Sequence, residues 1–201
     1  MTKTQLPDDV YPDSWCRLPL VEREELAHGA QEIFDEIEKP GGGSHAGLRG
    51  PGGVRLHSGR LAELWRPVAR YLRQETGISP RVREVAILIT AREHESQFEW
   101  FQHEGIAARH GVPPETIQAI KYGEPVKDLE KIDALVIEFG RQLFGNRRVT
   151  SDLFAEVLEA LGKQKLVDLI AIMGQYAATA ALLNAVDMQL PPGQEPPLPL
   201  G

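Results

Sequence analysis

The residues best suited to chemistry stand in one short stretch, between Ser96 and His103. Residues three and four apart share a face of a helix, so Ser96, Glu99 and His103 are expected to lie side by side. A carboxylate one turn before an imidazole can orient the ring, hold one tautomer and raise its basicity. Glu84 reaches the same place if two helices fold back on each other. We therefore predict an acid–base site of His103, Glu99 and Glu84, with His103 as the general acid or base.

Two other interpretations of this stretch stay open. Glu99 and His103 could form an ordinary surface pair, with the small stabilisation typical of exposed ion pairs. Phe98, Trp100 and Phe101 argue against that pair being exposed, because aromatic residues on most sides of a helix indicate burial. A metal site is the second interpretation, since histidines and glutamates gather nearby. The HExxH pattern is absent and zinc would need a ligand from elsewhere, so we expect no metal.

Further polar residues are candidates for binding a substrate. The glycine-rich segment 40–58 is expected to be an irregular loop, which could close as a lid over a pocket. It lacks the Gly-Lys-Ser/Thr ending of a phosphate-binding P-loop. An arginine in it suits an anionic substrate, because a guanidinium can bind a carboxylate through two hydrogen bonds. The substrate-binding candidates are Ser96, Arg49, His57 and Tyr176, and further polar groups of the loop are Ser44 and His45.

The elements that must position these residues are all predicted to be helices. Apolar residues recur at helical spacing in seven segments, with no competing strand pattern: 21–39, 61–74, 81–109, 114–121, 129–144, 151–161 and 166–188. Ser79 and Pro80 predict a helix start, and the polar run 92–96 predicts a break within 81–109. The helix over 61–74 is expected to face inward through Leu61, Leu64, Trp65, Val68 and Leu72. The fold class is therefore all-α, a helical bundle in a single domain.

Length and composition limit the organisation and the partners. The 201 residues suit one domain, here 21–190, preceded by an extended segment 1–20 and followed by a Pro-rich tail 191–201, extended or disordered. A net charge of −7 without a basic cluster argues against nucleic-acid binding. One cysteine and no signal-peptide pattern indicate a cytoplasmic protein. The helix over 166–188 is long enough for a membrane span, but its polar residues favour a core or interface helix.

Several motifs together resemble the carboxymuconolactone decarboxylase family, within the AhpD-like superfamily. The resemblance runs from about Gly47 to Met188 and rests on Gly50-Pro51, Leu56-His57-Ser58, the run 79–88, Phe98-Glu99-Trp100-x-x-His103-Glu104, Ala108-x-x-Gly111-Val112 and Gly174-Gln175-Tyr176. The peroxidase branch of that superfamily carries a glutamate, a CxxC pair and a histidine. These positions fall on Glu84, Ser96, Glu99 and His103, so both thiols are missing. Thiol peroxidase activity is therefore disfavoured, because it needs a thiolate and a resolving thiol.

The resemblance implies an all-α enzyme that forms homotrimers or homohexamers and needs no cofactor. Its implied activity is decarboxylation of a small lactone carboxylic acid in aromatic-compound breakdown, a carbon–carbon lyase reaction. In that reaction the lactone carbonyl accepts the electrons left by CO₂, and His103, with Glu99 and Glu84, would supply the proton. The alternatives are a ligand-binding member with a vestigial site and, less favoured, a metal-dependent hydrolase. A small anionic substrate is the expected partner, with no nucleic acid and no membrane.

Overall fold

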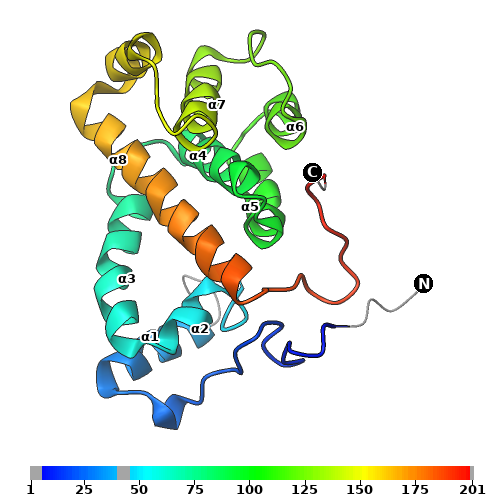
Figure 1. The fold of residues 1–201 in the computed structure, drawn as a ribbon. Helices are drawn as coiled ribbons and strands as arrows, with labels where there is room; N and C mark the ends of the chain where they lie inside the picture. Colours follow the sequence, from blue (N-terminus) through cyan, green and yellow to red (C-terminus); the bar gives the residue numbers. More distant parts are fainter. Residues whose placement is uncertain (1–5, 40–45, 200–201) are drawn as a thin grey trace. The chain divides into compact units, whose positions relative to one another are not determined.

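The computed structural model describes residues 6–39 and 46–199, and the regular structure in these residues is helical (Figure 1). Besides the helices, these residues contain an isolated bridge between Tyr11 and Cys16. The predicted all-α class is therefore confirmed. The chain divides into two compact units, Met1–Tyr71 with Ala181–Glu195 and Leu72–Ala180 with Pro196–Gly201. The expected domain limits at residues 20 and 190 stay a prediction.

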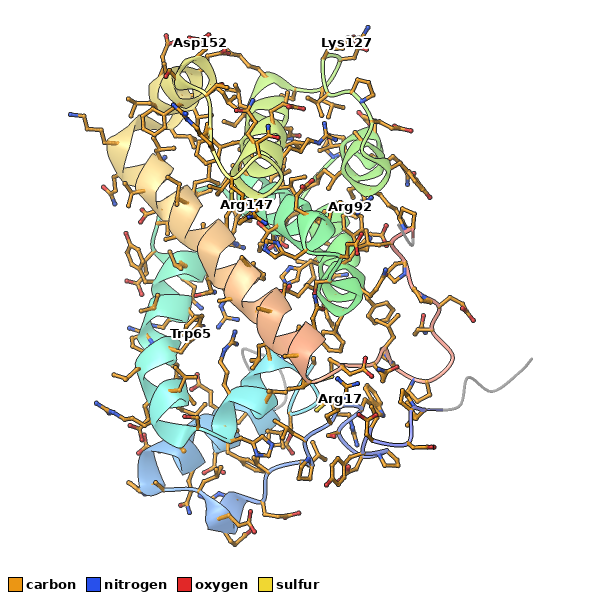
Figure 2. The ribbon with its side chains drawn as sticks, viewed as in Figure 1. Arg17, Trp65, Arg92, Lys127, Arg147 and Asp152 are labelled. Carbon is orange, nitrogen blue, oxygen red and sulfur yellow. The ribbon has the colours of Figure 1, made fainter. Side chains whose placement is uncertain are left out.

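The first unit contains a short 3-10 helix and three α-helices, η1 (Arg23–Glu25), α1 (His28–Glu38), α2 (Pro51–Leu56) and most of α3 (Gly59–Gln74). Its core joins Ala30 and Ile33 of α1 to Leu56 and Ala62. Trp65, labelled in Figure 2, lies on α3 with the Arg55 guanidinium 4.9 Å from its ring centre. These contacts hold α2 and α3 within one apolar cluster.

Two boundaries in this unit differ from the prediction. The single helix expected over 21–39 is wrong, because η1 and α1 are separate and α1 begins only at His28, after an Ala27 that provides no side-chain cap. The irregular loop expected over 40–58 is wrong from Pro51 onward, where α2 begins. Proline suits the first helical position because its missing N–H needs no partner there. Ser44 and His45 lie outside the described residues.

The inward face predicted for α3 is partly wrong. Leu72 is buried, but Leu61, Leu64 and Val68 are 45%, 55% and 53% exposed. The face that packs inward instead carries Ala62, which joins Ala30 in the core. Small side chains on both helices allow a close approach, so the bulky stripe is left on the outer face.

The second unit is built around α4 (Pro80–Glu93), which packs against α5 (Gln97–Arg109), α6 (Pro114–Tyr122) and α7 (Lys131–Phe144). Ser79 caps α4 by accepting a hydrogen bond from the Val82 N–H at 3.3 Å, as its sequence predicts. The break expected between residues 92 and 96 is confirmed. Arg92, labelled in Figure 2, donates from Nε to the Lys121 carbonyl at 3.0 Å and ties α4 to the end of α6. Every residue from Val85 to Ala91 is buried, which makes α4 the centre of this unit.

The last helical run, α8 (Ser151–Ala185), contains one break. Gly162 has φ +75° and ψ 167°, a conformation that glycine adopts without a steric penalty, and it separates residues 151–161 from 163–185. The two helices predicted over 151–161 and 166–188 therefore exist, but only the break at Gly162 separates them. By length and composition α8 could cross a membrane, yet a core helix of a soluble protein has the same features. With Leu166, Leu169, Ile172 and Met173 buried, the structure is compatible with a soluble protein.

Candidate active site

The centre of the site is a hydrogen bond between α4 and α5. Nδ1 of His103 lies 2.8 Å from Oε2 of Glu84, and the two side chains are 12% and 4% exposed. Glu84 stands one turn into a helix that is buried on all sides, and His103 stands midway along α5, which packs on it. A carboxylate accepts and does not donate, so Nδ1 carries the proton of this bond. The second ring nitrogen, Nε2, takes no part in this bond.

A third residue, Arg83, binds the other oxygen of Glu84. Its guanidinium Nη2 lies 3.6 Å from Oε1 of Glu84, and its Nη1 donates to the Arg73 carbonyl. Glu84 therefore contacts a cation through one oxygen and the imidazole through the other. Arg83 is not among the residues predicted for the site. The available signal was an arginine directly before the predicted catalytic carboxylate, followed by the apolar run from Val85 to Ile89.

Tyr176 of α8 packs its ring edge-on against His103. The ring centres are 5.2 Å apart and the planes meet at 87°. Burial raises the pKa of the Tyr176 phenol, and the charges of Glu84 and Glu99 raise it further. The phenol therefore keeps its proton at neutral pH and is a donor beside the imidazole. Tyr176 comes from far along the chain, yet it belongs to the same compact unit as Glu84 and His103.

Glu99 and Ser96 are buried at the start of α5. They are 3% and 1% exposed, which rules out a solvated surface pair of Glu99 and His103. Ser96 occupies the N-cap position of α5, but its side chain makes no capping bond and its buried Oγ has no hydrogen-bond partner. Ser96 therefore does not cap α5 through its side chain. Trp100 is fully buried on the next turn, with the Lys121 ammonium 5.9 Å from its ring centre.

The other two substrate-binding candidates lie in the first unit. Nε of Arg49 donates to the Asp13 carbonyl at 2.7 Å, and its guanidinium lies 5.1 Å from the Trp15 ring centre. Nε2 of His57 lies 3.0 Å from the Pro19 carbonyl oxygen. Both side chains thus hold the N-terminal segment against the glycine-rich region. Their part in substrate binding stays a prediction.

Metal ligands are not assembled in the part of the chain that the structure describes. Within residues 6–39 and 46–199 no three His, Cys, Asp or Glu side chains gather in a way that could hold an ion. The groups in contact at the site are the imidazole of His103, the carboxylate of Glu84, the guanidinium of Arg83 and the phenol of Tyr176. That set can transfer and stabilise protons.

Comparison with protein-family models gave no match, and comparison with curated proteins found none with significant similarity. The resemblance to the carboxymuconolactone decarboxylase family therefore stays an expectation from the motifs.

Proposed function

We propose that this chain is a cofactor-independent carbon–carbon lyase of the carboxymuconolactone decarboxylase type. Its substrate would be a small lactone or enolisable carboxylic acid, and its place would be aromatic-compound catabolism in the cytoplasm. The observation that carries the proposal is the buried bond of 2.8 Å between Glu84 Oε2 and His103 Nδ1. A carboxylate that orients an imidazole in a largely dry site is the arrangement needed for general acid–base catalysis.

The proposed reaction needs one proton and no redox step. The carbon–carbon bond to the carboxylate breaks, its electron pair moves into the conjugated lactone carbonyl, and CO₂ leaves. The resulting dienolate then takes a proton on carbon from Nε2 of protonated His103, and solvent restores that proton. Glu84 stabilises the imidazolium through Nδ1, and the neutral phenol of Tyr176 can donate a hydrogen bond to the dienolate oxygen.

Glu99 and Ser96 complete the proposed site. Glu99 is a second buried acid within electrostatic reach of Tyr176, because its charge raises the pKa of that phenol. Ser96 offers a buried hydroxyl that has no protein partner. The proposed substrate is a small anion, and the positive charge of Arg83 offsets the negative charge of Glu84 at the site.

A homo-oligomer, a trimer or a hexamer, is part of the proposal. Val167 and Ile170 on α8 are 64% and 37% exposed, and Phe154 is 43% exposed. Exposed apolar side chains that gather on one element are typical of a surface that another chain covers. The small residues that follow on α8 would permit a close approach of helices.

The test is turnover of lactone carboxylic acids, measured as CO₂ release. His103→Ala is expected to lower kcat about 10²-fold to 10⁴-fold, the usual contribution of a general acid or base. The matched control is His110→Ala, which removes an exposed histidine at the end of the same helix. Unchanged turnover in His103→Ala would refute the proposed role. Failure of the wild-type chain to turn over any lactone acid, with a measurable affinity for them, would favour a ligand-binding protein with a vestigial site.

A further inference from the structure

The segment Pro196–Pro199 is hydrogen-bonded to α5 through the main chain of Leu198. Its sequence is Pro-Pro-Leu-Pro, and proline has no backbone N–H. Leu198 therefore carries the only N–H donor of these four residues. The sequence predicts an extended or disordered tail, but the structure shows Leu198 buried, with 2% of its surface exposed.

Both hydrogen-bonding groups of Leu198 are bound by one side chain, Gln97. Oε1 of Gln97 accepts from the Leu198 N–H at 2.9 Å, and Nε2 donates to the Leu198 carbonyl at 3.2 Å. A primary amide offers a donor and an acceptor side by side in one plane, which suits the N–H and the carbonyl of one residue. Main-chain hydrogen bonds combined with a buried side chain are the general means by which proteins recognise peptides.

The contact between Gln97 and Leu198 bears on the candidate active site, because Gln97 begins the helix that carries Glu99 and His103. Gln97 is the first residue of α5, and the helix has no side-chain cap at Ser96. The first N–H groups of a helix have no partner within it, so an uncapped first turn frays readily. Glu99 stands in this turn, and the Trp100 N–H closes it on the Ser96 carbonyl at 3.0 Å.

We propose that the first turn of α5 is a peptide-docking site for a proline-bounded leucine, and that Pro196–Pro199 of the same chain is its occupant. The docked segment holds the first turn of α5 in helical form and thereby keeps Glu99 in place. A peptide of the same chemistry competes with the segment for Gln97. This inference does not depend on the proposed reaction.

The test uses two full-length variants, Leu198→Asp and Gln97→Ala, and amide hydrogen exchange followed residue by residue. Both are expected to raise the exchange rates of the Trp100 to Gln102 amides about tenfold or more, while amides in the centre of α7 keep their rates. The matched control, Gln102→Ala, changes the same residue type on the same helix and is expected to leave the Leu198 amide protected. Unchanged exchange at Trp100 to Gln102 in both variants would overturn the proposal.

A peptide added in trans tests whether the site is a binding site. Glu-Pro-Pro-Leu-Pro at millimolar concentration is expected to restore the protection of Trp100 to Gln102 in Leu198→Asp, and the same peptide with Asp for Leu is expected to leave it lost. Protection that the leucine peptide does not restore would contradict a docking site. Protection in the wild type that rises with protein concentration would show that the occupant comes from a second copy, which would overturn the assignment to the same chain.

Discussion

At the scale of residues, the site depends on what surrounds one carboxylate. Glu84 is buried, and burial of an unpaired charge is costly. Arg83 and His103 each contact one of its two oxygens. Arg83 and His103 therefore both offset the buried charge of Glu84. Arg83 is a positioning residue for the proposed acid–base pair.

Replacement of Arg83 tests that role. Arg83→Gln is expected to lower kcat at least about tenfold, with little change in KM, because it removes the charge that holds Glu84 in position. Arg83→Lys keeps the charge and is expected to retain most of the activity. NMR of the His103 ring measures the same effect. The signal of the proton on Nδ1 is expected to disappear in Arg83→Gln and to remain in Arg83→Lys. Arg109→Gln, which removes an exposed arginine of α5, is the control.

Glu93, the last residue of α4, is expected to make the stability of the fold depend on pH. Burial raises the pKa of Glu93 from its ordinary value of 4.5, with the charge of Glu138 adding to the rise and Arg141 and Arg92 opposing it. The folded chain then holds this proton at pH values where the unfolded chain has lost it. Its contribution to stability is present below pH 4.5 and is lost as the pH rises through the raised pKa.

Glu93→Gln is therefore expected to flatten the fall in the free energy of unfolding above pH 4.5. Urea unfolding at several pH values up to neutrality measures that slope. Glu115→Gln removes the same charge from an exposed position and separates the effect of charge from the effect of burial. An equal slope in Glu93→Gln and wild type would contradict this account.

At the scale of elements, the close contact of α4 and α7 depends on a missing side chain. A Cβ added at Gly140 would stand 2.8 Å from both Cγ1 and Cγ2 of Ile89. Ile89 is fully buried on α4, and its branched stem cannot turn away. Glycine at this position of α7 therefore sets the distance between the two helices.

Gly140→Ala is expected to lower the free energy of unfolding by about 1–3 kcal/mol, the usual cost of overpacking a core. Gly174→Ala is the matched control, because nothing lies within 4 Å of the added Cβ. That change is expected to raise stability by about 0.5–1 kcal/mol, since alanine favours a helix interior. Thermal unfolding of both variants measures these changes in stability. An equal change in Gly140→Ala and Gly174→Ala would refute the packing argument.

The sequence predicted the elements wherever the signal was local. Ser79 with Pro80 marks the start of α4, and the polar run 92–96 marks its end. The start of α1 has no such signal, because Ala27 does not cap the helix. The sequence predicted that Glu84 and His103 lie close together, because a short connection lets the two helices that carry them fold back on each other. Arg83 directly precedes Glu84 and could have been found in the sequence. Leu198 could not be predicted in the same way, because its contact with Gln97 depends on how distant segments pack.

At the scale of the whole molecule, exposed apolar side chains are the feature on which the proposed homo-oligomer depends. Residue spacing alone cannot distinguish a helix face that meets the core from one that meets another subunit. The bulky stripe of α3 illustrates this, because Leu61, Leu64 and Val68 have the pattern of a core face and are exposed. Their exposure agrees with the proposed homo-oligomer.

Val167→Glu tests the assembly. A charge at this exposed position of α8 is expected to dissociate a trimer or hexamer into monomers, measured as molar mass by light scattering, without loss of helix content. Asp152→Lys changes the charge at the exposed start of α8, before the break at Gly162 that separates it from Val167, and serves as the control. A wild-type chain that is monomeric at every concentration would refute the homo-oligomer.

The burial of Trp100 has a practical consequence for optical measurements. Trp100 lies fully buried one turn before His103 on α5, with the Lys121 ammonium 5.9 Å from its ring centre. The chain has two other tryptophans, Trp15 and Trp65, and replacing both by phenylalanine leaves one indole. Its fluorescence would then respond to events at the start of α5, where the acid–base pair and the docked segment meet the same helix. Ligand binding can thus be followed in solution without a dye.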